Sequence, residues 1–224
     1  MRRLVCLAET DSTNNWLKRQ SALRAFTSVR AVLQSAGRGR AERSWFSGSP
    51  GDNLAFSILL PYDASLAGLL PAHVALVCHE VLSHWISTRI KWPNDILFEG
   101  RKLAGILCES FPAEQNLFIV GIGMNVAQRD FPPDLRDMAT SLAQATGQLH
   151  DAGSLWLRLT RALWREFRRP RTAQEIIPAY DRVAVRYHRR REYPGEILEF
   201  ETLLSDGRAA FLLGGERLML DQAS

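Results

Sequence analysis

The sequence predicts an α+β (mixed α/β) fold, with helices packed on one side of a central mixed sheet and a short β-rich segment at the C-terminal end. Short apolar runs rich in β-branched and aromatic residues alternate with amphipathic stretches through most of the chain. The pattern changes from helix to strand after the arginines at residues 189–191. We therefore expect a large first domain, residues 1–190, and a small second domain, residues 191–224.

The first part of the chain combines strands with one short and one long helical stretch. Strands are expected at residues 3–8, 29–34 and 53–60. Asp11 or Ser12 is a natural N-cap for a helix that ends near residue 20. Residues 66–85 predict one or two amphipathic helices. Because this apolar stretch contains Pro71 and Glu80, it predicts a core helix and not a membrane span.

Residues 90–107 predict two apolar strands joined by a turn at residues 99–101. Residues 93–95, Pro-Asn-Asp, are expected to bend the first of these strands, which would run from residue 90 to 98. Lys91 and Lys102 bracket the hairpin, Asp95 lies between them, and Gly105 sits inside a strand, where a close approach is common. Lysines beside a dry pocket suit a carboxylate or a phosphate. On spacing alone, an ordinary hairpin with solvated lysines is the commoner explanation.

The elements after residue 115 are predicted from the same patterns of apolar and turn-forming residues. Residues 116–126 predict a strand that runs into a Gly-x-Gly turn at residues 121–123, which lacks the third glycine of a dinucleotide-binding fingerprint. Helices are expected at residues 140–146, 155–167 and 173–187, and short strands between residues 197 and 220. Asp206-Gly207 and Gly214-Gly215 would form the turns between those strands.

Composition limits the class of protein. The chain is 46% hydrophobic and 23% charged, with a net charge of +4, which falls short of a nucleic-acid-binding footprint. The cysteines, at positions 6, 78 and 108, form no CxxC pair, so reduced, buried thiols are expected. His73, His79 and His84 lack the HExxH order and are expected to be structural. A cytoplasmic protein without a signal peptide is predicted.

Residues 34–45 form a loop in which glycines and arginines alternate before Trp45; we call it the glycine–arginine loop. Glycines let backbone N–H groups approach a phosphate, and arginines supply bidentate charge. Trp45 can wall an apolar ligand or stack on a base. The GxxxxGK[ST] pattern of a P-loop is absent. The alternative is a surface loop with solvated arginines.

Five blocks in order resemble the biotin protein ligases, a branch of the biotin and lipoate ligase superfamily. They are Asp11-Ser12-Thr13-Asn14, residues 34–45 with the pattern GRGRxxRxW, Lys91-Trp92-Pro93-Asn94-Asp95, residues 101–107 (RKLAGIL), and residues 121–126 (GIGMNV). A weaker sixth block is residues 139–142. Together the blocks cover residues 9 to 145.

The resemblance implies a catalytic domain similar to the class II aminoacyl-tRNA synthetases, followed by a truncated SH3-like domain. It implies that the protein activates biotin with ATP and Mg²⁺ as biotinyl-5′-AMP and transfers biotin to a lysine of the carrier domain of acetyl-CoA carboxylase. The chain begins close to the first block, so no DNA-binding domain and no DNA partner are expected. No membrane association is expected, and the protein would be a monomer or a homodimer.

The resemblance also implies roles for individual residues. Lys102 and Arg40 would be catalytic. Biotin would be bound by Ser12, Thr13, Asn14, Gln34, Gly37, Arg38, Gly39, Trp45, Lys102, Gly105, Gly121 and Gly123. The nucleotide would be bound by Arg38, Arg40, Arg43, Trp45, Asn94, Asp95 and Asn125, with Asp95 as the candidate Mg²⁺ ligand. Lys91 is expected to support the hairpin.

Two departures from the family pattern and two rival functions remain. Ala41-Glu42 replaces an Arg-Gly pair, which predicts a looser loop over the intermediate, and the C-terminal segment is short for its nucleotide contacts. A lipoate or octanoate ligase would share the fold and the central lysine. A non-catalytic nucleic-acid or carrier-binding protein would instead use the arginines near residues 165–171 and 189–191.

Overall fold

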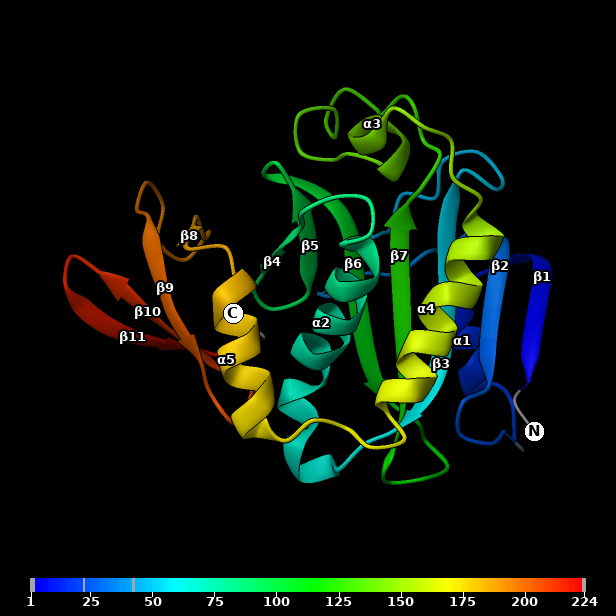
Figure 1. The fold of residues 1–224 in the computed structure, drawn as a ribbon, viewed down its shortest axis with the longest axis horizontal. Helices are drawn as coiled ribbons and strands as arrows, with labels where there is room; N and C mark the ends of the chain where they lie inside the picture. Colours follow the sequence, from blue (N-terminus) through cyan, green and yellow to red (C-terminus); the bar gives the residue numbers. More distant parts are fainter. Residues whose placement is uncertain (1–2, 22, 42, 223–224) are drawn as a thin grey trace.

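The computed structural model describes residues 3–21, 23–41 and 43–222. Its main sheet has seven strands in the order β1-β2-β3-β7-β6-β5-β4, and a second sheet has four strands in the order β11-β10-β9-β8 (Figure 1). In the main sheet β1 and β2 are parallel, and every other neighbouring pair is antiparallel. The predicted mixed sheet is confirmed.

The elements have the following bounds. The main sheet is built from β1 (Leu4–Thr10), β2 (Ser28–Gln34), β3 (Asn53–Pro61), β4 (Arg89–Lys91), β5 (Asp95–Phe98), β6 (Arg101–Ser110) and β7 (Leu117–Asn125). The helices are α1 (Thr13–Lys18), the 3₁₀ helix η1 (Ala64–Leu69), α2 (Leu70–Leu82), α3 (Leu142–Thr146), α4 (Ala152–Glu166) and α5 (Ala173–Val183). The second sheet contains β8 (Tyr187–His188), β9 (Leu198–Leu203), β10 (Ala209–Leu213) and β11 (Glu216–Leu220).

Helices cover both faces of the main sheet. Alternate residues of β3, such as Phe56 and Ile58, belong to the large core under α2 and α4. Leu59, on the opposite face of the same strand, packs with Leu17 of α1 and Ile119 of β7. Because successive strand residues point to opposite faces, α1 lies on the other side of the sheet from α2 and α4. The expectation of helices on one side only was wrong.

The turn and cap signals explain where most elements begin and end. Glu99 and Gly100 have φ of 48° and 79°, as a tight hairpin turn requires, and the β10–β11 turn has φ of 59° and 91° at Gly214 and Gly215. Asp151 caps α4 by accepting a hydrogen bond from the Ser154 backbone N–H at 2.7 Å. The predicted turns at residues 99–101, 206–207 and 214–215 are confirmed.

Three local expectations were wrong. Residues 90–98 form two antiparallel strands, β4 and β5, because a cis Trp92–Pro93 bond lies in a turn between them. Gly121 and Gly123 lie inside β7 and not in a turn. Cys6 is exposed and not buried, because it lies on β1 at the edge of the sheet, whereas Cys78 is buried.

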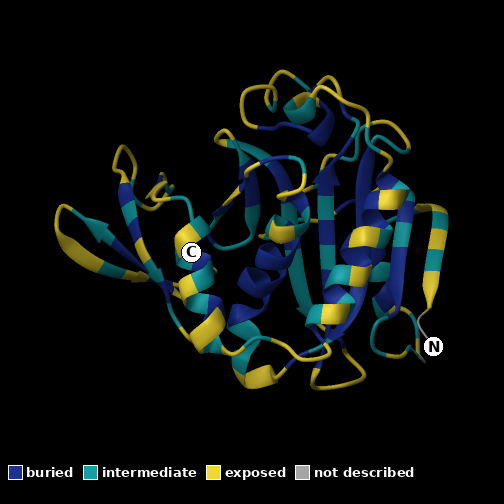
Figure 2. Cartoon of the chain, in the orientation of Figure 1, coloured by how far each residue is buried: buried dark blue, intermediate teal, exposed yellow. Residues whose placement is uncertain are grey.

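The second sheet packs against the first at the end that carries β4 and β5. Helix α5 lies between the two sheets, and its faces alternate between buried and exposed residues (Figures 1 and 2). The Trp92 ring meets Phe211 of β10 at 5.7 Å between centroids, and Trp92 Nε1 donates to the carbonyl of Gly207 at 3.3 Å. The backbone of Gly207 also packs against Gly68 of η1. A Cβ on Gly207 would overlap the Gly68 carbonyl, so only glycine lets the two backbones approach this closely. One apolar cluster contains residues of both sheets, so the packing of the core does not mark a border between two domains. The domain boundary at residue 190 stays a prediction.

Among the residues that the structure describes, one stretch, Ala64–Leu82, is long and apolar enough to cross a membrane by length and composition. It comprises η1 and α2; α2 packs against α4, α5 and strands β4, β5 and β6, and η1 packs against α5. The 61% burial of its most apolar window inside the fold is what a core helix shows.

Candidate active site

A cavity of about 610 Å³ lies on the α1 face of the main sheet, and residues from all five sequence blocks line it. The predicted site residues in its wall are Ser12, Thr13, Asn14, Gln34, Arg38, Gly39, Arg40, Arg43, Trp45, Asn94, Asp95, Lys102, Gly105, Gly121 and Gly123. Gly37 and Asn125 are outside this wall. The loop position Glu42 lies outside the described residues, so its expected effect stays a prediction.

The floor of the cavity is bare backbone. Strand register aligns Asp95 of β5, Gly105 of β6, Gly123 of β7 and Ala55 of β3 in one row across the sheet. A Cβ on Gly123 would lie 2.5 Å from Trp45 Cε2, and a Cβ on Gly105 would lie 3.1 Å from Trp45 Cζ3. The missing side chains therefore let the Trp45 indole lie directly against the sheet.

One end of the cavity is a hydrogen-bonding pocket. The Thr13 backbone N–H and hydroxyl donate to Gln34 Oε1 at 2.8 and 3.0 Å. Ser57 Oγ lies 2.7 Å from Thr13 Oγ1 and donates to Asn14 Oδ1 at 2.5 Å. Gly121 allows this arrangement, because a Cβ there would overlap Asn14 Oδ1. The pocket presents fixed donors and acceptors to a polar ring.

Lys102 marks the other end. Its Nζ lies 2.7 Å from Asp95 Oδ1 and 5.5 Å from the centre of the Trp45 ring. The backbone of Lys102 is held on both sides, since its N–H donates to the Met138 carbonyl and its carbonyl accepts from the Thr140 N–H. Asn125 donates to the carbonyls of Lys102 and Thr140 at 3.4 and 3.0 Å, so it supports the backbone of the lysine.

The glycine–arginine loop folds back on itself over the cavity. Trp45 N–H donates to the Gly37 carbonyl at 2.9 Å, and Gly39 N–H donates to the Arg43 carbonyl at 2.6 Å. The turn places Ala41 at φ 49°, a left-handed conformation that disfavours alanine relative to glycine. Trp45 Nε1 is buried and has no hydrogen-bond partner among the described residues.

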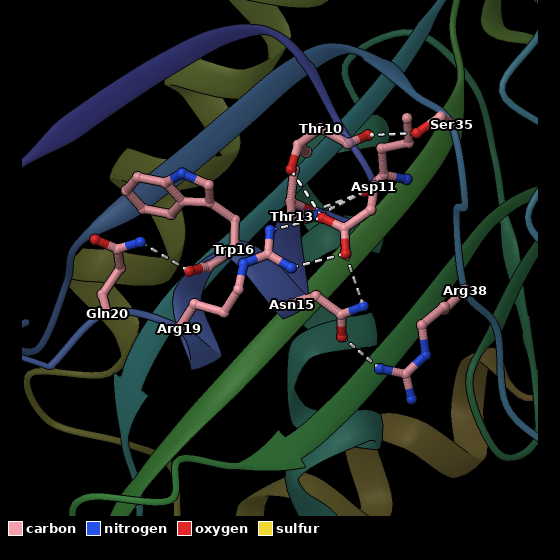
Figure 3. Close-up of polar contacts among 10 residues, drawn as sticks. Thr10, Asp11, Thr13, Asn15, Trp16, Arg19, Gln20, Ser35 and Arg38 are labelled. Carbon is pink, nitrogen blue, oxygen red and sulfur yellow. Dashed lines mark hydrogen bonds and ion pairs between the residues drawn. The ribbon is translucent and has the colours of Figure 1, made fainter.

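The arginines of the loop have different environments. Arg38 points out toward α1, where it donates to Asn15 Oδ1 at 2.7 Å, and Asn15 is linked through Asp11 to Arg19 (Figure 3). Arg40 is part of the cavity wall instead. Burial lowers the pKa of Arg40, Asp95 raises it in part, and the charges of Arg43 and Arg190 lower it further. An anion beside Arg40 would relieve this repulsion.

Sequence reasoning missed one wall of the cavity. This wall is formed by His188 of β8 and the four residues after it, Arg189, Arg190, Arg191 and Glu192, together with Lys91 and Trp92. The Arg190 guanidinium lies 5.2 Å from the centre of the Trp92 ring. The run of three arginines was visible in the sequence, but its position depends on packing between segments far apart in the chain.

The donor set does not fit a magnesium ion held by protein side chains. Among the described residues no group of three or more His, Cys, Asp or Glu is placed to hold a metal ion. Asp95, the predicted ligand, is paired with Lys102, and Glu192, the other carboxylate in the wall, lies near Arg190. A magnesium ion bound mainly through the phosphates of a nucleotide needs only one or two carboxylates, so the metal role of Asp95 stays a prediction.

His188 gives the fold a predicted pH dependence. Burial lowers its pKa from 6.5 to about 4, and its Nε2 lies 2.8 Å from the Val185 carbonyl. Between these two pKa values the unfolded chain binds a proton that the folded chain does not, so stability falls as pH falls from 6.5 to 4. We expect His188→Phe to remove at most about 3 kcal/mol of this loss. Chemical denaturation at several pH values measures it, and equal pH slopes for both proteins would contradict it.

The fold is that of the catalytic domain of biotin protein ligases. A biotin protein ligase from Aquifex aeolicus in complex with biotin and ATP matches with a TM-score of 0.79 and 26% identity, over 100% of this chain and 97% of that one. Residues 6–126 match the model of the biotin/lipoate A/B protein ligase family, and the chain belongs to this family.

Curated relatives agree over the same region. The bifunctional ligase/repressor BirA of Bacillus spizizenii is 44% identical over 133 residues, which cover 56% of this chain and 41% of BirA. A biotin--[acetyl-CoA-carboxylase] ligase of Paracoccus denitrificans is 41% identical over 131 residues, 54% of this chain and 53% of that one. The matched region is thus about half the length of these relatives.

Proposed function

We propose that this chain is an ATP-dependent ligase that joins biotin to AMP and then transfers biotin to a lysine of a biotin carboxyl carrier domain. The observation that carries the proposal is that one cavity has a hydrogen-bonding pocket at one end and Lys102, Arg40 and Arg190 toward the other. This arrangement suits a ligand with a polar ring, an apolar middle and a carboxylate. The relatives named above support biotin as that ligand.

In the first step a carboxylate oxygen of biotin attacks the α-phosphorus of ATP. An O–P bond forms, the bond from that phosphorus to the bridging oxygen of the β-phosphate breaks, and pyrophosphate leaves. Because both reactants are anions, cations must hold them together. We assign Lys102 to the biotin carboxylate and the α-phosphate, and Arg40, Arg43 and Arg190 to the phosphates.

In the second step the neutral amine of a carrier lysine attacks the acyl carbon of the adenylate. An amide bond forms, AMP leaves with the bonding electrons, and the amine loses a proton to solvent. Until the carrier arrives, Trp45 and the glycine floor exclude water from the mixed anhydride. Thr13, Asn14 and Gln34 hold the ring of biotin.

The test is ATP–pyrophosphate exchange with biotin, with lipoate and with neither acid. We expect exchange with biotin alone. Exchange with lipoate alone would keep the fold and overturn the substrate. If neither acid supports exchange, adenylation is refuted, and RNA or DNA affinity that falls steeply with salt would then support the binding alternative. The acetyl-CoA carboxylase carrier, the oligomeric state, the absence of DNA and membrane partners and the cytoplasmic location stay predictions.

The wall formed by the second sheet predicts a nucleotide contact. We expect Arg190→Ala to raise the KM for ATP about ten-fold, a loss of about 1.4 kcal/mol, while the KM for biotin stays within about two-fold. Arg217→Ala is the matched control, because Arg217 is paired with Glu201 on the second sheet, at 2.6 Å. Parallel increases in both KM values would show instead that Arg190 supports the fold.

A further inference from the structure

One carboxylate outside the cavity wall accepts hydrogen bonds from three different side chains. Glu109, near the end of β6, accepts from Lys18 Nζ at 2.6 Å and Arg38 Nη2 at 3.2 Å through Oε1. It accepts from Asn14 Nδ2 at 2.7 Å through Oε2. Its side chain is 18% exposed. Lys18 and Asn14 belong to α1, whereas Arg38 belongs to the glycine–arginine loop.

Two of these donors are parts of the cavity wall. Asn14 lies over Gly121 and accepts from Ser57, so its position shapes the hydrogen-bonding pocket. Arg38 follows Gly37, the residue whose carbonyl accepts from the Trp45 N–H. Its second contact, with Asn15, also leads to α1 (Figure 3). A displacement of Arg38 would therefore reach the loop that carries Trp45.

We propose that Glu109 is a positioning residue of the ligase: it joins the ligand-ring pocket and the glycine–arginine loop in one network, so that the loop stays closed over the cavity. Glu109 touches neither the cavity nor the reacting atoms in this arrangement. The ligand named in the kinetic test rests on the proposed function, whereas the link between Glu109 and the loop does not.

Only a carboxylate satisfies this network. All its partners are donors, and Asn14 Nδ2 also faces the Leu107 carbonyl at 3.5 Å, which fixes the orientation of its amide. In Glu109→Gln, the new NH₂ group would face either Asn14 Nδ2 or the Lys18 and Arg38 cations. The first orientation places the NH₂ group against one donor, and the second places it against two. Glutamine has nearly the size of glutamate, so the variant changes the hydrogen bonding with little change in packing.

The first experiment is hydrogen–deuterium exchange of the unliganded protein. We expect Glu109→Gln to accelerate exchange of the backbone amides of residues 37–45 by about five-fold or more. Glu201→Gln is the matched control, because it breaks an Arg–Glu pair at 2.6 Å on the second sheet. Unchanged loop exchange in Glu109→Gln would overturn the proposal, whether or not the protein uses biotin.

The second experiment separates positioning from a general structural role. We expect Glu109→Gln to raise the KM for biotin about ten-fold, because Asn14 and Trp45 lie in the proposed biotin site. The kcat for pyrophosphate exchange should fall by no more than about three-fold, because the loop also carries Arg40 whereas Lys102 lies outside the network. The double variant Glu109→Gln/Arg38→Met should be no worse than the worse single variant. Additive effects, or kcat falling with thermal stability while KM stays constant, would contradict a role through Arg38. If the wild type itself shows no ATP–pyrophosphate exchange with biotin, the proposed function fails. The hydrogen–deuterium exchange of the loop then decides alone whether Glu109 positions it.

Discussion

Replacement of Lys102 by methionine is expected to lower the rate of biotin adenylation by about a hundred- to a thousand-fold, the usual effect of removing one stabilising group from a developing charge. Lys102 Nζ is positioned by Asp95 at 2.7 Å, and its backbone is held between Met138 and Thr140. Methionine keeps the length and apolar stem and removes the charge. Single-turnover formation of the adenylate measures the chemical step directly.

Two companion variants test the cause of that loss. Lys102→Met leaves the Asp95 carboxylate without its cation, and this charge alone could repel the substrate carboxylate. The double variant Lys102→Met/Asp95→Asn removes the repulsion, and recovery to wild-type rates would assign the loss to Asp95. Lys91→Met removes the other cavity lysine, and we expect it to cost no more than about ten-fold. An equal loss in both lysine variants would contradict the central role of Lys102.

The Gly123→Ala variant is expected to weaken biotin affinity by about ten- to a hundred-fold with little change in stability. Its Cβ would lie 2.5 Å from Trp45 Cε2, so the indole must leave the sheet. Trp45 is half-buried on a loop and can move, whereas β7 cannot. A loss of about 2–3 kcal/mol is consistent with one misplaced aromatic wall. Isothermal titration with biotin measures it.

The control for this variant lies on the same strand. Val120 is buried in the core on the opposite side of the sheet and is not part of the cavity wall, so Val120→Ala should lower stability by about 2 kcal/mol and leave biotin affinity unchanged. If Gly123→Ala binds biotin as wild type does, the indole does not form the wall of the ligand site.

Local signals in the sequence predicted much of this molecule. Turn pairs such as Gly214-Gly215 and helix starts such as the one at Ser12 depend on a few residues, so they can be recognised without a fold, although the Ser12 side chain makes no cap hydrogen bond. The cis Trp92–Pro93 turn was missed because cis and trans prolines have the same letters. Glu109 was missed because its three partners come from α1 and the loop, and no spacing in the chain relates them.

The glycines of the cavity floor show a second limit of sequence-based prediction, because their alignment is not visible in the sequence. Gly105 was recognised as a point of close approach, but the alignment of Asp95, Gly105, Gly123 and Ala55 depends on strand register. Likewise, Arg38 was expected to bind ligand from its place in the loop, whereas its guanidinium faces Asn15 and Glu109. Residue type predicted membership of the site, and packing decided the direction of each side chain.

The glycine floor of the cavity is made of main chain, so a substitution there can only reduce the volume of the cavity. Any substitution at Gly105, Gly121 or Gly123 adds atoms above the sheet, and none can remove any. Mutation at these positions can therefore take space from the floor of the proposed ligand site but cannot add any. If the chain is the proposed ligase, space for bulkier biotin analogues would have to come from Trp45, whose indole lies against this floor and can be replaced by a smaller side chain.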